Sequence, residues 1–213
     1  MNISARFTLA IAAALSCSSG AAAQRAFPVD FRLQISTNSV RTHLGTPSGA
    51  TTQGGRSSQV VEFDLVGQNS GLGLAGRYQS GDGGSGRSSN AYDAMVLLGD
   101  KSFHLELGYA QRTLVQLDTS FAMIRAGFST VTHLGMSGVA MRTRAGFARP
   151  VKQYTGGKLG PEYWEGETGV SYTWDRLPIF AQLGYRMSRL KANGYDEERS
   201  SVILGAGFWF WSR

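Results

Sequence analysis

The chain has 213 residues and a formal net charge of +6, with 28 glycines, 5 prolines and one cysteine. Its Lys and Arg residues form no run, which argues against a nucleic-acid-binding patch. One cysteine allows neither a disulfide framework nor a cysteine-based metal site. No segment after residue 23 has the run of about 20 apolar residues that a membrane-spanning helix needs.

The N-terminus has the pattern of a secretory signal peptide. Met1–Arg6 carries a positive charge, Phe7–Ser16 is apolar, and the small residues Ala21–Ala23 precede Gln24. This order of regions is typical of a leader that is cleaved after the small residues, here after Ala23. We therefore expect a signal peptide over residues 1–23 and one domain over residues 24–213, which then contains no thiol.

Ten segments of the expected domain alternate apolar and polar residues. The fifth shows the pattern well, because Leu105 and Leu107 alternate with His104, Glu106 and Gly108. A period of two predicts β-strands with one apolar face. The ten segments lie at residues 30–40, 61–68, 72–79, 92–98, 103–110, 122–129, 139–147, 164–174, 179–187 and 202–211.

A glycine followed by an aromatic residue recurs within these segments. We expect each glycine on the polar face, where it leaves room for crowded side chains, because glycine inside a strand is otherwise unfavourable. By the same phase, Phe208 and Phe210 belong to the apolar face of the last segment. The fragment occurs at Gly108-Tyr109, Gly127-Phe128, Gly146-Phe147, Gly184-Tyr185 and Gly207-Phe208.

The connections between the segments differ in length. Residues 41–58, 80–90, 149–162 and 190–199 form long gaps, whereas those near 69–70, 99–101 and 175–178 are tight. Two further gaps, 113–119 and 132–137, are intermediate. Short turns at one rim and long loops at the other are typical of outer-membrane barrels. We expect an all-β, transmembrane, antiparallel up-and-down barrel of about ten strands, with eight possible if the first or fourth is miscounted.

The polar face of the strands carries acids and bases in similar numbers. Nearly all the bases are arginine, whose planar guanidinium suits confined carboxylate pairs better than lysine does. We expect a charge network that fills a narrow lumen; the alternative is a solvated face, as on a soluble barrel of the lipocalin type. Arg112 shares this face. The expected network consists of Arg32, Glu62, Asp64, Arg77, Asp93, His104, Glu106, Arg125, Arg142, Arg144, Glu165, Glu167 and Arg186.

Aromatic residues gather near the ends of the apolar faces. Two aromatic girdles are expected where an apolar band meets water on both sides of a membrane. The girdle at the long-loop end comprises Tyr78, Tyr92, Tyr109, Phe147 and Trp164, and that at the short-turn end comprises Phe103, Trp174 and Phe210.

The last strand, Val202–Trp211, resembles the terminal strand of outer-membrane barrel proteins, which closes on an aromatic residue; here Ser212 and Arg213 follow it. The chain as a whole resembles small outer-membrane barrels of the OmpA and OmpX kind, without a diagnostic motif. Members of that class commonly have eight strands. The resemblance implies a place in the outer membrane, contact with its lipid and lipopolysaccharide, and assembly by the barrel-assembly machinery. A monomer is expected, and the resemblance fixes no activity.

Three functions remain open, and the balanced charge favours a structural or surface-interaction barrel with a plugged lumen. A narrow pore is the second. The third is a lipid-modifying enzyme in which His104, oriented by Glu106, activates Ser129 or Ser171. No catalytic residue, cofactor or metal ligand is assigned, because His43 and His133 lack partners at ligand spacing. We expect Asp196–Glu198 at a solvated loop tip, where carboxylates could attract a divalent cation.

Overall fold

A computed structural model describes residues 29–46, 48–68, 70–82, 88–100, 102–114, 119–135, 138–151, 161–174, 177–192 and 194–211. Side chains are described for these residues except 50–56, 82, 88, 89, 114 and 211. The expected signal peptide over residues 1–23 lies outside the described residues. No helix in the described part of the chain is long and apolar enough to cross a membrane.

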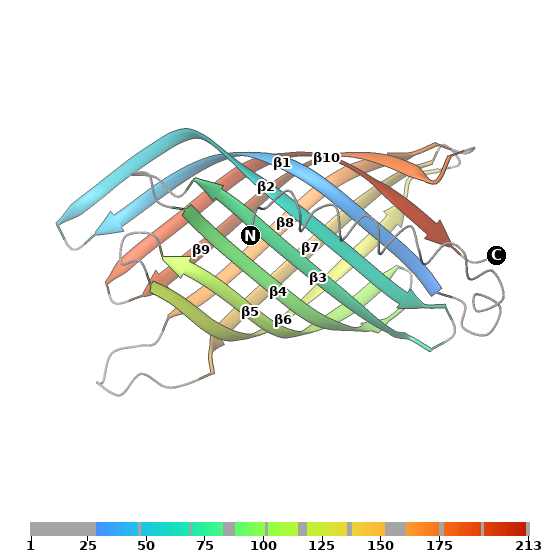
Figure 1. Cartoon of the computed structure of the whole chain (residues 1–213), viewed down its shortest axis with the longest axis horizontal. Helices are drawn as coiled ribbons and strands as arrows, with labels where there is room; N and C mark the ends of the chain where they lie inside the picture. The colour runs from blue at the N-terminus through green and yellow to red at the C-terminus, as the bar shows by residue number, and fades with distance from the viewer. Residues whose placement is uncertain are drawn as a thin grey trace, which may run out of the picture.

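Ten antiparallel strands form a closed barrel in which the first strand pairs with the last (Figure 1). The predicted ten strands are confirmed, and the alternative count of eight is wrong. All other strands pair with their neighbours in the sequence. The strands are β1 (Val29–Thr46), β2 (Gly49–Gly67), β3 (Leu72–Asp82), β4 (Ser88–Gly99), β5 (Phe103–Leu114), β6 (Thr119–His133), β7 (Val139–Pro150), β8 (Glu162–Thr173), β9 (Ile179–Ala192) and β10 (Tyr195–Trp211).

The alternation in the sequence corresponds to the two faces of the barrel wall. On β5, Leu105 and Leu107 are 48% and 49% exposed, whereas Glu106 and Ala110 are 0% exposed. Successive side chains of a strand point to opposite faces, so one set faces outward and the other faces the lumen. The phase predicted for the last strand is also found, because Phe208 and Phe210 both face outward and are exposed.

Two of the expected long loops are instead extensions of strands. The segment 41–58 belongs to β1 and β2, which remain paired as far as Thr46 and Gly49, and 190–199 belongs to β9 and β10. The β1–β2 hairpin reaches beyond the other strands at one end of the barrel (Figure 1). Pairing continues because β1 is held on both edges, by β2 and by β10 up to Gly45. A Gly-, Ser- and Thr-rich composition does not reveal this support.

The acidic stretch Asp196–Glu198 is therefore in β10, not at a loop tip. Glu197 is buried and Arg199 contacts it, while Asp196 accepts a hydrogen bond of 2.7 Å from Arg189 Nε. This hydrogen bond holds the pKa of the Asp196 carboxyl below its usual range. His43, expected in a loop, lies in β1 beside these residues, where it pairs in register with Glu198.

The rim opposite the β1–β2 extension is formed by tight connections. Between β4 and β5, the Asp100 carboxylate accepts hydrogen bonds of 2.7 and 2.9 Å from the backbone N–H groups of Ser102 and Phe103. These hydrogen bonds lower the pKa of the Asp100 carboxyl. Gly138 precedes β7 with a φ of 69°, a left-handed conformation that glycine adopts without strain. We call this end of the barrel the short-turn rim and the other end the extended rim.

Candidate functional site in the barrel lumen

The middle of the lumen is filled by ion pairs centred on two carboxylates. Glu165 accepts hydrogen bonds from Arg77 at 2.7 Å, from Arg125 at 2.6 Å and from the Tyr163 hydroxyl at 2.7 Å. Arg77 comes from β3, Arg125 from β6 and Glu165 from β8, so these contacts join separate parts of the wall. Three donors on one buried carboxylate offset much of the free energy that burial of its charge costs.

Glu106 is the second centre and is completely enclosed. It accepts a hydrogen bond of 2.7 Å from Arg125 Nη1 and one of 2.8 Å from Arg144 Nε, and both Glu106 and Arg125 are 0% exposed. Gly146 makes room for this arrangement, since a Cβ at that position would lie 2.5 Å from Arg125 Nη2. The expected role of the strand glycines thus has a specific physical cause at Gly146.

Further ion pairs extend this network around the wall. Arg186 of β9 contacts Glu62 of β2 at 2.8 Å and Glu167 of β8 at 2.6 Å. Asp93 receives Arg77 Nε at 2.7 Å on one side and Arg112 Nη2 at 2.7 Å on the other. The Arg, Asp and Glu residues of the expected network therefore form one connected set of ion pairs, in which each arginine contacts at least one carboxylate, whereas His104 stands outside it.

The part of the network nearest the short-turn rim is less enclosed. Asp64 contacts Arg142 at 2.9 Å and Arg32 at 3.6 Å. Arg32 also donates a hydrogen bond of 2.7 Å to the Gln182 side chain, and its guanidinium lies 4.6 Å from the centre of the Phe180 ring. Arg142 and Arg144 lie on β7, the strand next to that of Glu165 and Glu167, but both reach across the lumen to Asp64 on β2, at 2.9 Å and 3.7 Å. Arg144 also reaches Glu106 on β5, two strands away.

An apolar cluster lies inside the lumen on the extended side of the network. The Phe121, Met123, Tyr163 and Leu190 side chains face inward, pack together and are at most 6% exposed. Arg112 joins the network to this cluster, because its guanidinium lies 4.3 Å from the centre of the Tyr163 ring. We call these four side chains the apolar plug.

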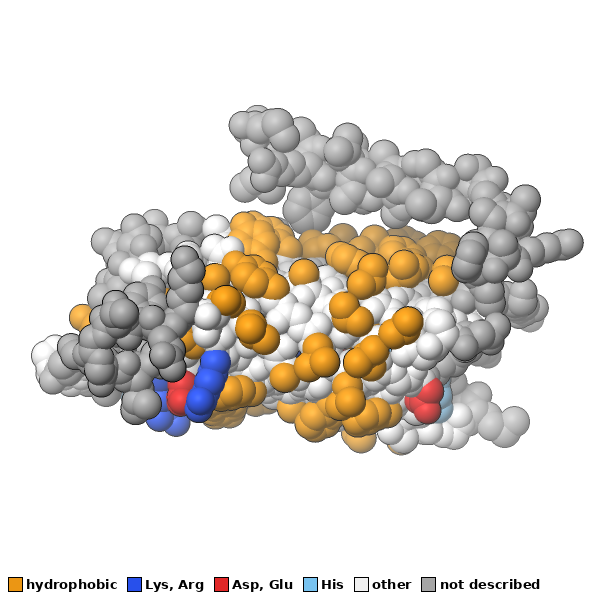
Figure 2. All heavy atoms as spheres, turned by 90° about the horizontal axis from the view of Figure 1, so that it is seen from below, with side chains coloured by type: hydrophobic (Ala, Val, Ile, Leu, Met, Phe, Trp, Pro, Cys, Tyr) orange, Lys and Arg blue, Asp and Glu red, His pale blue; other side chains and the backbone are white. Residues whose placement is uncertain are grey.

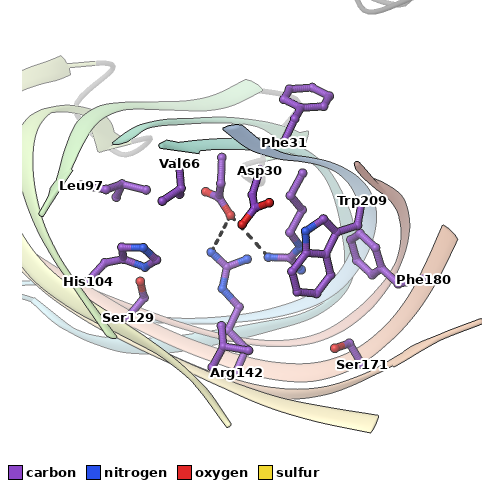
Figure 3. A pocket seen from close by; sticks show the side chains of 13 residues that line it. Asp30, Phe31, Val66, Leu97, His104, Ser129, Arg142, Ser171, Phe180 and Trp209 are labelled. Atoms are coloured by element: carbon purple, nitrogen blue, oxygen red, sulfur yellow. Dashed lines mark hydrogen bonds and ion pairs between the residues drawn. The ribbon is translucent and has the colours of Figure 1, made fainter. Parts of the chain in front are cut away.

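His104 lies apart from the network, at a cavity near the short-turn rim. It pairs in register with Ser129, and both side chains line the cavity (Figure 3). The His104 Nε2 atom is buried and has no hydrogen-bond partner among the described residues. Ser129 therefore does not donate to this nitrogen, as a serine activated by Nε2 would have to do. The described residues also contain no group of three or more His, Cys, Asp or Glu side chains suited to a metal ion.

The outer surface has the opposite character to the lumen. Large apolar side chains cover the wall between the rims, and charged side chains lie toward the ends (Figure 2). A soluble barrel would have the reverse arrangement, with apolar residues inside. In the closed part of the barrel, each strand is paired with a neighbour on both edges, as a membrane requires. The chain is an outer-membrane β-barrel.

The aromatic residues assigned to the girdles lie on this outer face, and several contact one another. The Tyr78 and Tyr92 ring centres are 5.0 Å apart, and Phe147 and Trp164 pair in register on β7 and β8. At the short-turn rim, Trp174 contacts Tyr172 with ring centres 5.0 Å apart. The remaining three, Tyr109, Phe103 and Phe210, are exposed on the same face.

Neither a family model nor a curated protein matches this chain. Among solved structures, it is similar to Neisserial surface protein A, with 14% identity and a TM-score of 0.45 over 84% of this chain and 97% of that one. The Escherichia coli outer-membrane protease OmpT gives 10% identity and 0.49 over 87% and 98%. Ail, the attachment invasion locus protein of Yersinia pestis, gives 10% identity and 0.36 over 84% and 98%. At these scores the matches identify no family for this chain.

The apolar plug is the part of the lumen that the sequence interpretation missed. Phe121 and Met123 share the inward phase of Arg125 on β6, and Leu190 shares that of Arg186 on β9. Continuing each alternation beyond its polar residues would have revealed these side chains. Tyr163 was missed for the same reason, although it lies two residues before Glu165 and donates a hydrogen bond to it.

Proposed function

We propose that this outer-membrane barrel is a closed, non-conducting scaffold that presents an extended β-hairpin at the cell surface. The observation that supports closure is the filling of the lumen at two successive levels, first by the ion-pair network and then by the apolar plug. A pore would need a continuous water-filled path, and both levels would have to move to create one.

The extended rim has the composition of a surface exposed to water. Outward-facing residues of β1 change from apolar, ending at Ile35, to the exposed polar residues Thr37, Ser39 and Arg41. Residues 49–57 of β2 pair with β1, and no other described strand pairs with their second edge. An extended segment of a partner protein could add to this edge by backbone hydrogen bonding.

We infer the lipid contacts and the oligomeric state of the barrel from its exposed basic residues and from its closure. The outward-facing side chains of Arg149 and Lys191 are 67% and 51% exposed at the extended rim, where they can contact the phosphate groups of lipopolysaccharide. Closure of β1 on β10 leaves no strand edge within the apolar band, which favours a monomer in the lipid. The barrel-assembly machinery remains the proposed assembly partner, acting on β10.

Conductance in a planar lipid bilayer tests closure. The folded protein should give no discrete current steps, because the network and the plug both block the lumen. A Phe121→Ala/Leu190→Ala variant should also be silent, since the network remains in place. Regular steps from the wild-type protein would show a narrow pore and contradict the proposal.

A shortened hairpin tests whether the extension belongs to the surface or to the closure of the barrel. Val40 and Arg56 are paired in register, so residues 41–55 can be replaced by a two-residue Asn-Gly turn. The shortened protein should fold, show heat-modifiable gel mobility and remain silent in the bilayer. If it fails to fold or conducts, the extension serves the barrel itself and the proposed surface role is wrong.

A further inference from the structure

The lumen contains a cavity of about 90 Å³ between the ion-pair network and the short-turn rim. Figure 3 shows side chains from strands on all sides of the barrel converging on it. This cavity is separate from the extended hairpin, and it would face the periplasm with the hairpin at the cell surface.

One part of the cavity wall is apolar. It consists of aliphatic side chains from β2, β4 and β6 and of aromatic side chains from β9 and β10: Val66, Leu97, Val131, Phe180 and Trp209. Water forms no hydrogen bonds with such a wall, whereas a small apolar group that packs against it gains free energy by leaving water.

The polar side chains of the wall lie next to these apolar ones and include an unsatisfied group. His104 projects into the cavity, with the Ser129 hydroxyl beside it and Ser171 across from it (Figure 3). The His104 Nε2 atom is buried without a hydrogen-bond partner among the described residues. A buried nitrogen of this kind is normally satisfied, so a ligand group at this position would complete its hydrogen bonding. In the neutral tautomer with the proton on Nδ1, Nε2 accepts a hydrogen bond.

The charges around the cavity disfavour an ionic ligand. The two arginines that line it, Arg32 and Arg142, both contact Asp64, so an anion would have to displace an existing carboxylate. A cation would meet the guanidinium groups of Arg32 and Arg142 together with the carboxylates of Asp30 and Asp64, so the charges of the lining balance and leave no excess negative charge to hold it. The best match is therefore a neutral molecule with one hydroxyl group and a small apolar body.

The volume limits the size of that body. An enclosed cavity of about 150 Å³ can hold benzene, so a cavity of about 90 Å³ accepts one ring only if part of it remains in the mouth. We propose that this cavity binds a small neutral phenol, with its hydroxyl donating to His104 Nε2 and its ring against Phe180 and Trp209.

Fluorine NMR of 4-fluorophenol with the folded, full-length mature barrel tests this proposal. Binding should be saturable, and unlabelled phenol should compete for it. Fluorobenzene, which lacks the hydroxyl, should bind about tenfold more weakly because His104 Nε2 stays unsatisfied. The anion 4-fluorobenzoate should not compete.

Two variants and a control separate the cavity from partition into lipid. His104→Phe keeps an aromatic ring but removes the acceptor, so it should abolish the preference for fluorophenol over fluorobenzene. Val131→Trp should fill the cavity and abolish saturable binding of both probes. Leu105→Phe, on the outer face of β5, should leave binding unchanged. Each variant is first checked for folding by heat-modifiable mobility.

Non-saturable uptake that is equal in the wild type and Val131→Trp would overturn the proposal, since it would show partition only. Tighter binding of fluorobenzoate than of fluorophenol would also overturn it, by showing an anion site. Unchanged selectivity in His104→Phe would remove the assigned role of the histidine. None of these results depends on whether the lumen conducts.

Discussion

Glu165 lies at the centre of the lumen network, and neutralising it should destabilise the barrel strongly. Glu165→Gln keeps the shape of the side chain but removes the charge that faces Arg77 and Arg125. Each arginine retains another carboxylate, Asp93 and Glu106 respectively, so one positive charge is left uncompensated rather than two. Leaving one buried charge unpaired typically costs about 3–5 kcal/mol, and we expect the free energy of unfolding to fall by that amount.

Glu162→Gln on the same strand is the matched control. Its contact with Arg149 is at the rim, where the side chains are 67% and 39% exposed for Arg149 and Glu162. Such a pair contributes about 0–1 kcal/mol. Both variants are measured by urea unfolding in phosphatidylcholine vesicles, followed by tryptophan fluorescence.

A double variant makes the test sharper. Arg77→Gln combined with Glu165→Gln removes one charge of each sign, so its cost should be smaller than the sum of the two single costs. If Glu165→Gln destabilises the barrel no more than Glu162→Gln does, the lumen is hydrated and the network does not hold the wall together. Additive costs in the double variant would lead to the same conclusion.

Three other substitutions test separate features. Gly146→Ala should destabilise the barrel by about 1–3 kcal/mol in the same unfolding assay, since its Cβ would lie 2.5 Å from Arg125 Nη2. Gly166→Ala is the control and should be nearly neutral, because a Cβ there would have nothing within 4 Å. Equal effects of the two substitutions would contradict the close approach at Gly146. Leu107→Arg places a charge on the lipid face and should lower the free energy of unfolding by about 2–4 kcal/mol. Ser39→Arg, which lies beyond the apolar band of the outer face, should lower it by less than about 1 kcal/mol. The reverse order would argue against the assigned position of this band. The hydrogen bond from Arg189 lowers the pKa of Asp196 in the folded protein. This hydrogen bond therefore stabilises the β9–β10 hairpin fully at pH values above the usual carboxyl pKa of about 3.9. The stabilisation is lost as the pH falls through the lower pKa of the folded protein. The amide protection factors of the hairpin, which correct for the intrinsic pH dependence of exchange, should therefore fall at acid pH in the wild type and change less in Asp196→Asn. An identical pH response of the two proteins would count against this pairing.

The sequence predicted the strands and their faces well because the period of two is a local property. Leu105 and Glu106 reveal their faces without knowledge of the partner strands. The side of the barrel that each face occupies is not local, and it followed from the arginines and from the aromatic residues at strand ends. Both the period of two and the residue types on each face can be read from a single sequence.

Features that depend on neighbouring strands could not be predicted in this way. The polar residues of segment 41–58 continue as strands only because β10 supports β1, which no local pattern reports. Likewise, Arg144 faces Glu167 in register on the next strand but donates to Glu106 two strands away on the other side, since an arginine side chain is long enough to reach several carboxylates. The cavity beside His104 depends on nine strands meeting at one rim, which is a property of the closed barrel.

Fluorescence quenching by brominated lipid tests the central claim most directly, namely that the apolar face contacts lipid and the charged face lines the lumen. In a background with the four native tryptophans replaced by phenylalanine, one tryptophan is introduced at Leu107, which is 49% exposed, or at Phe121, which is 2% exposed. In vesicles with brominated acyl chains, the Leu107→Trp protein should be strongly quenched and the Phe121→Trp protein should not. Strong quenching at position 121 with none at 107 would contradict the account.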